Sequence, residues 1–125
     1  MQANAPKSRY SDEELEEFRI LIEGKLENAR RELTFYKDQL KEIAENPDSK
    51  VKSLDDGVSS MESERLFELA GRQEKLIKHL ENALIRIKNK VYGVCRESGR
   101  LISKERLRAV PHATLSIDAK KSRRR

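Results

Sequence analysis

The chain has 125 residues, of which 39% are charged and 5% are aromatic, with no Trp, and its formal net charge is +5. A chain of this length and composition cannot build two independent hydrophobic cores, so long exposed helices are expected. No apolar run approaches the roughly 20 residues that a membrane span requires, and the first residues lack the apolar core of a signal peptide. We therefore expect a cytoplasmic protein with no membrane partner. The single Cys excludes an internal disulfide.

The charge is distributed unevenly along the chain. Residues 95–125 hold ten Lys or Arg against three Asp or Glu, a balance of +7, whereas residues 45–64 hold six acids against two lysines, a balance of −4. The basic tail at 120–125 is able to attract phosphates or acidic protein without sequence preference, although a solvated tail is the alternative. No groove-reading module accompanies it, so sequence-specific DNA binding is not expected.

Residues 11–46 have the pattern of a long amphipathic helix. Ser11 and Glu14 form a capping box, in which each side chain accepts a hydrogen bond from the other residue's backbone N–H. Asn46-Pro47 ends the helix because proline disfavours helical geometry in the residue before it. The apolar seam of this helix consists of Leu15, Ile22, Leu26, Ala29, Leu33, Tyr36, Leu40 and Ile43.

Residues 59–91 repeat this pattern after a polar turn at 47–58. A second capping box, Ser59 with Glu62, opens the predicted helix. Two such helices joined by one turn predict an antiparallel coiled-coil hairpin about 50 Å long. The seam of the second helix consists of Leu66, Leu69, Gln73, Leu76, Leu80, Ala83 and Ile87.

The helical period ends after Val91, and short elements are expected beyond it. Gly93 and Gly99 indicate tight turns, Ser103 is placed to cap a helix at 104–110, and Ser116 is placed to cap a last short helix. The predicted fold class is all-α. Its predicted parts are a flexible N-terminus at 1–10, the hairpin at 11–91 with its tip at 47–58, a small globular end at 92–119 and a basic tail at 120–125.

Residues 92–120 carry a recognisable frame, formed by Tyr92, Gly93, Gly99, Arg106, Leu107, Ala109, Pro111, Leu115 and Lys120. It resembles the zinc knuckle of the DksA/TraR family of small bacterial transcription regulators. That knuckle reads Tyr-Gly-x-Cys-x-x-Cys-Gly, then Arg-Leu-x-Ala-x-Pro, then Leu-Cys-x-x-Cys-Lys. The resemblance extends over about residues 10–120. It implies a regulator that binds RNA polymerase and reaches through the secondary channel of the polymerase with its hairpin to modulate promoter complexes.

The four cysteine positions of the family read Cys95, Ser98, Ser116 and Ala119 in this chain. A structural zinc needs four sulfur or nitrogen ligands, and one thiol does not supply them even if His112 is added. No zinc is therefore expected, and Cys95 is expected to be a small packed residue. The apolar residues available for a metal-free core are Val94, Leu101, Ile102, Leu107, Val110, Leu115 and Ile117, supported by Phe18, Leu21, Val91 and Tyr92.

The resemblance also implies roles on the hairpin. The family tip carries Asp-x-x-Asp-x-Ala, and a gap-free count from Cys95 leaves Asp55 as its one match. With Asp56 as an additional acid and Gly57 at the Ala position, these residues are expected to face the polymerase active centre. Arg72 occupies the position of an arginine that contacts the polymerase rim. An ordinary polar turn and a solvated arginine are the alternatives.

Family members that sense the alarmone ppGpp use a Lys, an Arg and a Lys at positions that read His79, Val110 and Lys120 in this chain. Only Lys120 is retained, and the imidazole of His79 is charged only when protonated. A multiply charged phosphate needs several cations or N–H donors. Weak or absent ppGpp binding is therefore expected, with His79 as a solvated helix residue.

No catalytic constellation is present, so the chain is not expected to be an enzyme, and no cofactor is expected. Two other functions stay open. A Gre-like factor uses tip carboxylates to stimulate transcript cleavage by the polymerase, but such factors carry a larger β-rich domain after the hairpin. A structural coiled-coil adaptor oligomerises or binds another helical protein. A monomer is expected, and self-association remains an alternative.

Overall fold

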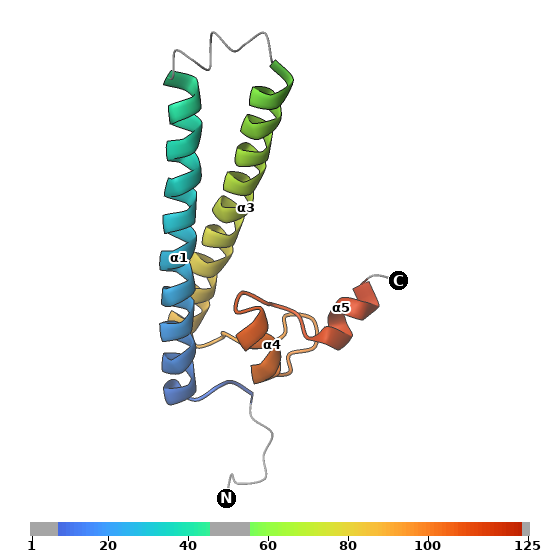
Figure 1. Ribbon diagram of the computed structural model, residues 1–125. Helices are drawn as coiled ribbons and strands as arrows, with labels where there is room; N and C mark the ends of the chain where they lie inside the picture. The colour runs from blue at the N-terminus through green and yellow to red at the C-terminus, as the bar shows by residue number, and fades with distance from the viewer. Residues whose placement is uncertain (1–7, 46–55, 124–125) are drawn as a thin grey trace, which may run out of the picture. The chain divides into compact units, whose positions relative to one another are not determined.

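The computed structural model describes residues 8–45 and 56–123 (Figure 1). These ranges contain two long helices, α1 (Asp12–Glu45) and α3 (Asp56–Lys88), and two short ones, α4 (Lys104–Ala109) and α5 (Ile117–Arg123). They contain no strand, only an isolated antiparallel bridge between Val94 and Leu101. The fold is all-α, a helical hairpin with a small end of short helices, which confirms the predicted class. No described helix is both long and apolar enough to cross a membrane.

The chain divides into two compact units. The central unit is Leu26–Lys78, and the terminal unit combines Met1–Lys25 with His79–Arg125. In the central unit, segments of α1 and α3 run antiparallel (Figure 1) and bury Leu26, Ala29 and Ala70. Phe35 and Phe67 lie outside this seam, with more than half of each side chain exposed. Leu26 and Ala29 belong to the predicted seam, whereas Ala70 follows the seam position Leu69 and widens the buried face of α3.

The terminal unit has a core in which aromatic rings meet aliphatic side chains. The ring of Phe18 lies 5.7 Å from that of Tyr10 and 5.3 Å from that of Tyr92, measured between centroids. Ile102 and Leu107, from the segment after the hairpin, are fully buried as predicted, whereas Val91 and Ile117 are about half exposed. The remaining buried apolar residues of the unit are Leu15, Ile22, Leu80, Ala83, Cys95 and Ala113.

Helix α1 begins where the capping box predicts. The backbone N–H of Glu14 donates to Ser11 Oγ over 3.1 Å, and the N–H of Ser11 donates to Glu14 Oε1 over 3.0 Å. Three acids in the first turn, Asp12, Glu13 and Glu14, lie at the positive end of the helix dipole. The cap thus satisfies backbone donors that a helix start leaves without intrahelical partners.

Both predicted bounds of the second long helix are wrong. Helix α3 begins at Asp56 rather than at Ser59. It ends at Lys88 rather than Val91 because Lys90 has a φ of +64°. The N–H of Val91 then bonds Arg86 O and that of Lys90 bonds Ile87 O, each over 3.0 Å. This is the Schellman pattern, whose positive-φ position usually carries Gly, so the sequence signal was missing.

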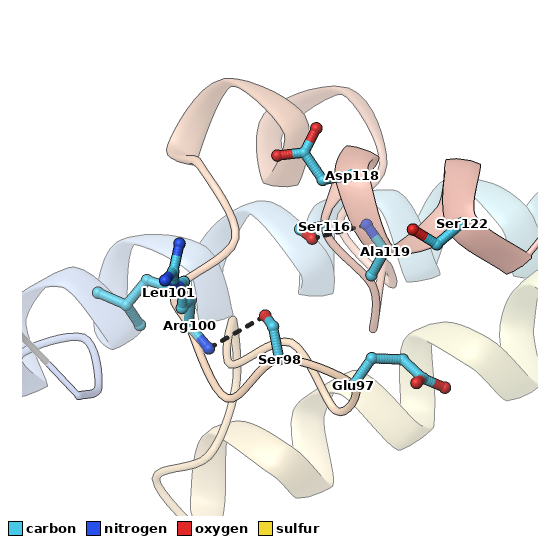
Figure 2. Close-up of a pocket in the computed structure, with 8 residues that line it drawn as sticks. All are labelled: Glu97, Ser98, Arg100, Leu101, Ser116, Asp118, Ala119 and Ser122. Carbon is cyan, nitrogen blue, oxygen red and sulfur yellow. Dashed lines mark hydrogen bonds between the residues drawn. The ribbon is translucent and has the colours of Figure 1, made fainter.

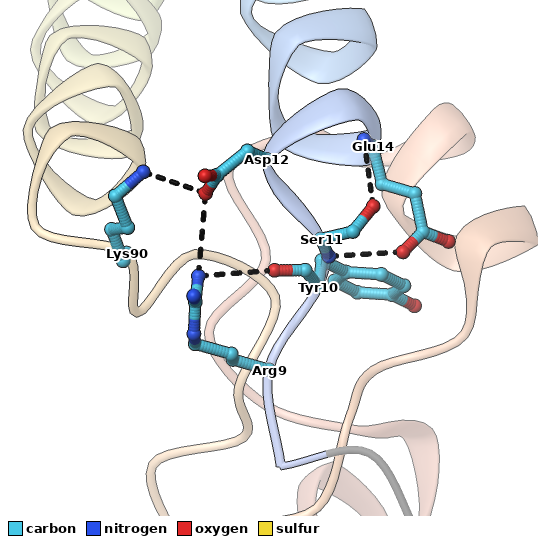
Figure 3. A network of polar contacts seen from close by, with 6 residues as sticks. All are labelled: Arg9, Tyr10, Ser11, Asp12, Glu14 and Lys90. Carbon is cyan, nitrogen blue, oxygen red and sulfur yellow. Dashed lines mark hydrogen bonds and ion pairs between the residues drawn. The ribbon is translucent and has the colours of Figure 1, made fainter. Parts of the chain in front are cut away.

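The predictions for the two ends of the chain also need correction. Tyr10, assigned to a flexible N-terminus, is 5% exposed and belongs to the core of the terminal unit. Beside it, Asp12 Oδ1 forms ion pairs with Lys90 Nζ, at 2.6 Å, and with Arg9 Nη1, at 3.5 Å (Figure 3).

Within the basic tail predicted at 120–125, the first four residues belong to α5, which extends to Arg123. Ser116 caps that helix, as predicted, by accepting from the N–H of Ala119 over 3.2 Å.

Candidate functional site

The knuckle-like segment, residues 92–120, is fixed by two tyrosines of the terminal unit, Tyr92 from within the segment and Tyr10 from before α1. Tyr92 donates its hydroxyl proton to Pro111 O over 2.8 Å, and burial raises the pKa of this phenol. The hydroxyl of Tyr10 donates to the carbonyl of Ile102. An ion pair of 2.5 Å between Lys104 Nζ and Glu14 Oε2 joins α4 to the start of α1. Within the terminal unit, these contacts hold the knuckle-like segment against the start of α1.

The four positions that correspond to zinc ligands are linked by hydrogen bonds. Cys95 is fully buried, and its Sγ accepts from the backbone N–H of Ser116 over 3.3 Å. Figure 2 shows the other three: Ser116 Oγ accepts from the N–H of Ala119, and Ser98 Oγ accepts from the N–H of Arg100 over 3.3 Å. Ser98, Ser116 and Ala119 line a cavity of about 610 Å³.

The thiol of Cys95 has an unusual acidity. Burial raises its pKa, but hydrogen bonds to the sulfur outweigh this effect and hold the pKa at about 6, against an ordinary value of 9.0. The donors are the hydroxyl of Ser98 and the backbone N–H groups of Ser116, Ser98 and Glu97. A ring of N–H and O–H donors therefore surrounds the sulfur, and these donors stabilise its anionic form.

These residues do not fit a structural zinc. The set offers one sulfur, two hydroxyls that already accept backbone hydrogen bonds, and the methyl group of Ala119. In the described ranges, no three His, Cys, Asp or Glu side chains gather closely enough to hold a metal ion. Backbone bonds join the segment instead, including Arg96 N–H to Thr114 O over 3.0 Å and Cys95 N–H to Arg100 O over 2.8 Å.

The three positions that correspond to a ppGpp site lie together in the terminal unit. His79 from α3, Val110 after α4 and Lys120 from α5 line one cavity of about 440 Å³. The structure adds three cations to this cavity, namely Arg86, Arg96 and Arg106. Arg106 belongs to the Arg-Leu-x-Ala-x-Pro motif of the frame, whereas Arg86 and Arg96 match no motif, and only the folded structure identifies the three as neighbours. The other lining residues are Asn82, His112, Ala113, Thr114 and Leu115.

Two histidines stack in this cavity. The rings of His79 and His112 are 5.3 Å apart between centroids and within 8° of parallel. His79 is exposed, as predicted, but it also has this ring partner. His112 Nδ1 is buried and has no hydrogen-bond partner in the described part of the chain. Burial, together with the neighbouring His79 and Arg86, lowers the pKa of His112, so its neutral form is favoured.

Two of the arginines are fixed to the backbone around this cavity. Arg86 Nη2 donates to His112 O over 3.4 Å, and Arg106 Nε donates to Leu115 O over 2.8 Å. Burial lowers the pKa of Arg86, and the positive charge of Arg96 lowers it further. The cavity therefore has a positively charged lining that is partly pre-positioned by hydrogen bonds.

The residues predicted for the hairpin tip are partly outside the described residues. Asp55 lies outside them, and Asp56 and Gly57 open α3 instead of belonging to the turn. Arg72 is on α3 in the central unit. Its guanidinium pairs with Glu68 over 2.9 Å, and about two thirds of each side chain is exposed.

Comparisons with known proteins agree with this architecture. The family model of the prokaryotic dksA/traR C4-type zinc finger matches residues 90–125. The chain is 33% identical over 127 residues to the RNA polymerase-binding transcription factor DksA of Caulobacter vibrioides, across 95% of this chain and 88% of that protein. It is 40% identical over 45 residues to general stress protein 16O of Bacillus subtilis, across 36% of this chain and 28% of that protein.

A solved structure resembles the whole arrangement. The transcription factor DksA2 from Pseudomonas aeruginosa matches with a TM-score of 0.83 and 25% sequence identity, across 96% of this chain and 91% of that chain. The frame in residues 92–120 had predicted this family, and the prediction is confirmed. By the extent and identity of these matches, the chain belongs to the DksA/TraR family.

Proposed function

We propose that this protein is a transcription regulator that acts by binding RNA polymerase. The observation that carries the proposal is the 33% identity, over nearly the whole chain, to a factor named for polymerase binding. The match of its fold to a transcription factor of known structure supports it further. Binding to two polymerase states with different affinities is enough to shift promoter complexes, so the protein itself needs no catalysis.

The proposed route is the secondary channel of the polymerase. The terminal unit is proposed to dock on the rim, with Arg72 as a contact from α3, while Asp55, Asp56 and Gly57 reach the active centre. Support comes from the two long helices of 34 and 33 residues, each about 50 Å at 1.5 Å per residue. The direct test is co-sedimentation of the full chain with purified cognate core polymerase. Binding at micromolar protein is expected, and no binding at that concentration would contradict the proposal.

The knuckle-like segment is proposed to work without zinc. The donors around Cys95, the hydrogen-bonded hydroxyls of Ser98 and Ser116, and the methyl of Ala119 support this. Metal analysis of purified protein is expected to find no stoichiometric zinc, and a chelator is expected to leave the melting temperature of the protein unchanged. A stoichiometric zinc whose removal unfolds the terminal unit would overturn the proposal.

Binding of ppGpp by the protein alone is proposed to be weak or absent at neutral pH. Val110 provides no charge at one of the three positions, and the His79 imidazole offers a positive charge only in its protonated form. Isothermal titration at pH 7.5 is the test. Tight binding there would show that the arginines around the cavity replace the missing groups.

A further inference from the structure

Helix α3 carries a second row of side chains besides its apolar seam. The members of this row recur at alternating spacings of four and three residues, so they share one face of the helix. Every one of them is exposed. The two large apolar members, Phe67 and Ile85, have 65% and 55% of their surfaces exposed. This outer stripe consists of Phe67, Gly71, Glu74, Lys78, Glu81 and Ile85.

The outer stripe is self-complementary when two copies of α3 run antiparallel. Its spacings of four, three, four, three and four residues read the same from either end. The first position of the stripe therefore meets the last position of the second copy, and the other positions pair in the same way toward the middle. Twofold symmetry makes each contact occur twice. The resulting layers pair Phe67 with Ile85, Gly71 with Glu81, and Glu74 with Lys78 of the second copy.

The chemistry of these layers favours the antiparallel arrangement. The apolar layer covers two side chains, Phe67 and Ile85, that the single chain leaves exposed. The central layer joins the carboxylate of Glu74 to the ammonium group of Lys78. A parallel pair in register would instead place Glu74 against Glu74 and Lys78 against Lys78, which is repulsive. Charge complementarity therefore selects one orientation and identifies a second copy of α3 as an occupant that fits.

Gly71 has no role that contacts within the described chain explain. A Cβ built on this residue meets nothing within 4 Å, so no close neighbour requires its small size. Glycine inside a helix is also less favourable than alanine. In the antiparallel pair, the missing side chain leaves room for Glu81 of the second copy and allows the two helices to approach closely.

We infer that the outer stripe of α3 is a docking surface for a second copy of this chain, which packs on it antiparallel in a twofold-symmetric dimer. The inference goes beyond polymerase binding, because it concerns the chain alone. From residue 67 to residue 85 the contact is about 27 Å long and one helix wide, so a weak, reversible dimer is expected. Lys75 flanks the twofold axis next to Lys75 of the second copy, and this like-charged contact also limits the affinity.

The test is sedimentation equilibrium of the full chain over a series of protein concentrations. A reversible dimer is expected, with a Kd between about 10 µM and about 1 mM. Phe67→Ser is expected to raise this Kd about tenfold, because it removes the larger side chain of the apolar layer from both ends of the contact. The Phe67 side chain is mostly exposed in the single chain, so this substitution is expected to leave the fold intact.

Charge exchange tests the antiparallel arrangement itself. Glu74→Lys and Lys78→Glu each place like charges in the central layer, and each is expected to raise the Kd at least about tenfold. The double variant Glu74→Lys/Lys78→Glu restores opposite charges across that layer and is expected to dimerise as the wild type does. Glu32→Lys makes the same charge change as Glu74→Lys at an exposed position of α1 and is expected to leave the Kd unchanged. Circular dichroism checks that every variant is folded.

Three results would overturn the inference. One is a chain that stays monomeric, with no Kd below about 1 mM, which would leave the outer stripe open to a different helical protein. Another is a dimer whose Kd neither single charge reversal changes. The third is a folded double variant that does not recover the dimer. No polymerase is present in these experiments, so each result leaves the proposed polymerase binding to be judged by co-sedimentation.

Discussion

The hydroxyl of Tyr10 donates a hydrogen bond to the backbone carbonyl of Ile102, 92 positions later in the chain. The ring of Tyr10 packs on Phe18 and closely approaches Gly93. One residue from the segment before α1 therefore joins the knuckle-like segment to the hairpin within the terminal unit. This contact is independent of the four positions that correspond to zinc ligands, Cys95, Ser98, Ser116 and Ala119.

Removing the Tyr10 hydroxyl is expected to destabilise the terminal unit. In Tyr10→Phe the ring packing stays, but the buried carbonyl of Ile102 loses its donor, at a cost of about 1–2 kcal/mol in the free energy of unfolding. Urea unfolding followed by circular dichroism measures this loss. Tyr36→Phe is the control, because the Tyr36 hydroxyl has no hydrogen-bond partner in the described part of the chain. An equal effect of both substitutions would contradict the role of Tyr10.

Gly93 and Gly99 provide a matched pair for the close approach of Tyr10. Both have positive φ, of +79° and +73°, so alanine at either carries a conformational cost of about 1 kcal/mol. A Cβ on Gly93 would in addition lie 2.6 Å from Tyr10 Cε2, whereas a Cβ on Gly99 meets nothing within 4 Å. We expect Gly93→Ala to lower the unfolding free energy by about 3 kcal/mol and Gly99→Ala by about 1 kcal/mol. Equal losses would show that Tyr10 moves aside freely.

The acidity of Cys95 makes stability depend on pH. Because its pKa in the folded chain is about 6, below the ordinary 9.0, the unfolded chain binds more protons between these values. The contribution of Cys95 to the unfolding free energy is therefore fully present above pH 9 and is lost as the pH falls through 6. Urea unfolding at pH 6 to 9 is expected to show rising stability in the wild type and a smaller rise in Cys95→Ser. The same slope in both proteins would contradict the hydrogen-bonded thiolate.

Docking on the polymerase rim predicts a specific effect of one arginine. Arg72→Ala is expected to weaken polymerase binding about tenfold, equivalent to about 1.4 kcal/mol. Arg31→Ala is the matched control, since Arg31 pairs with Glu27 at the same spacing and is equally exposed. Competition binding to core polymerase measures both affinities. If the two variants bind core polymerase with equal affinity, Arg72 does not contact the polymerase.

The hairpin and its seam were predictable because local rules act along one helix. Leu15, Ile22, Leu26 and Ala29 recur at helical spacings, and each is buried. The Ser11 capping box and the Ser103 cap were predicted correctly, because each depends on contacts between neighbouring residues. The end of α3 at Lys88 was missed because the positive φ of Lys90 is set by the structure around it rather than by the residue type.

The candidate site was predictable only in part. The resemblance identified His79, Val110 and Lys120, and the structure brings them into one cavity. It did not place Arg86, Arg96 or Arg106 in this cavity, although Arg106 belongs to the frame, and it did not identify the stacking of His112 on His79. These contacts join separate segments and follow no spacing rule. Tyr10 was missed for the same reason, since its partner Ile102 is distant in the sequence.

The proposed action of the tip acids on promoter complexes is tested most directly by the lifetime of those complexes, measured with wild-type protein and with Asp55→Asn/Asp56→Asn. Glu62→Gln/Glu64→Gln is the control, since it removes the same charge from exposed positions further along α3. All three proteins are expected to bind core polymerase, and only the Asp variant is expected to lose the effect on lifetime. The proposal would be contradicted if the Asp variant altered the lifetime as much as the wild type does, or if the wild type did not alter it.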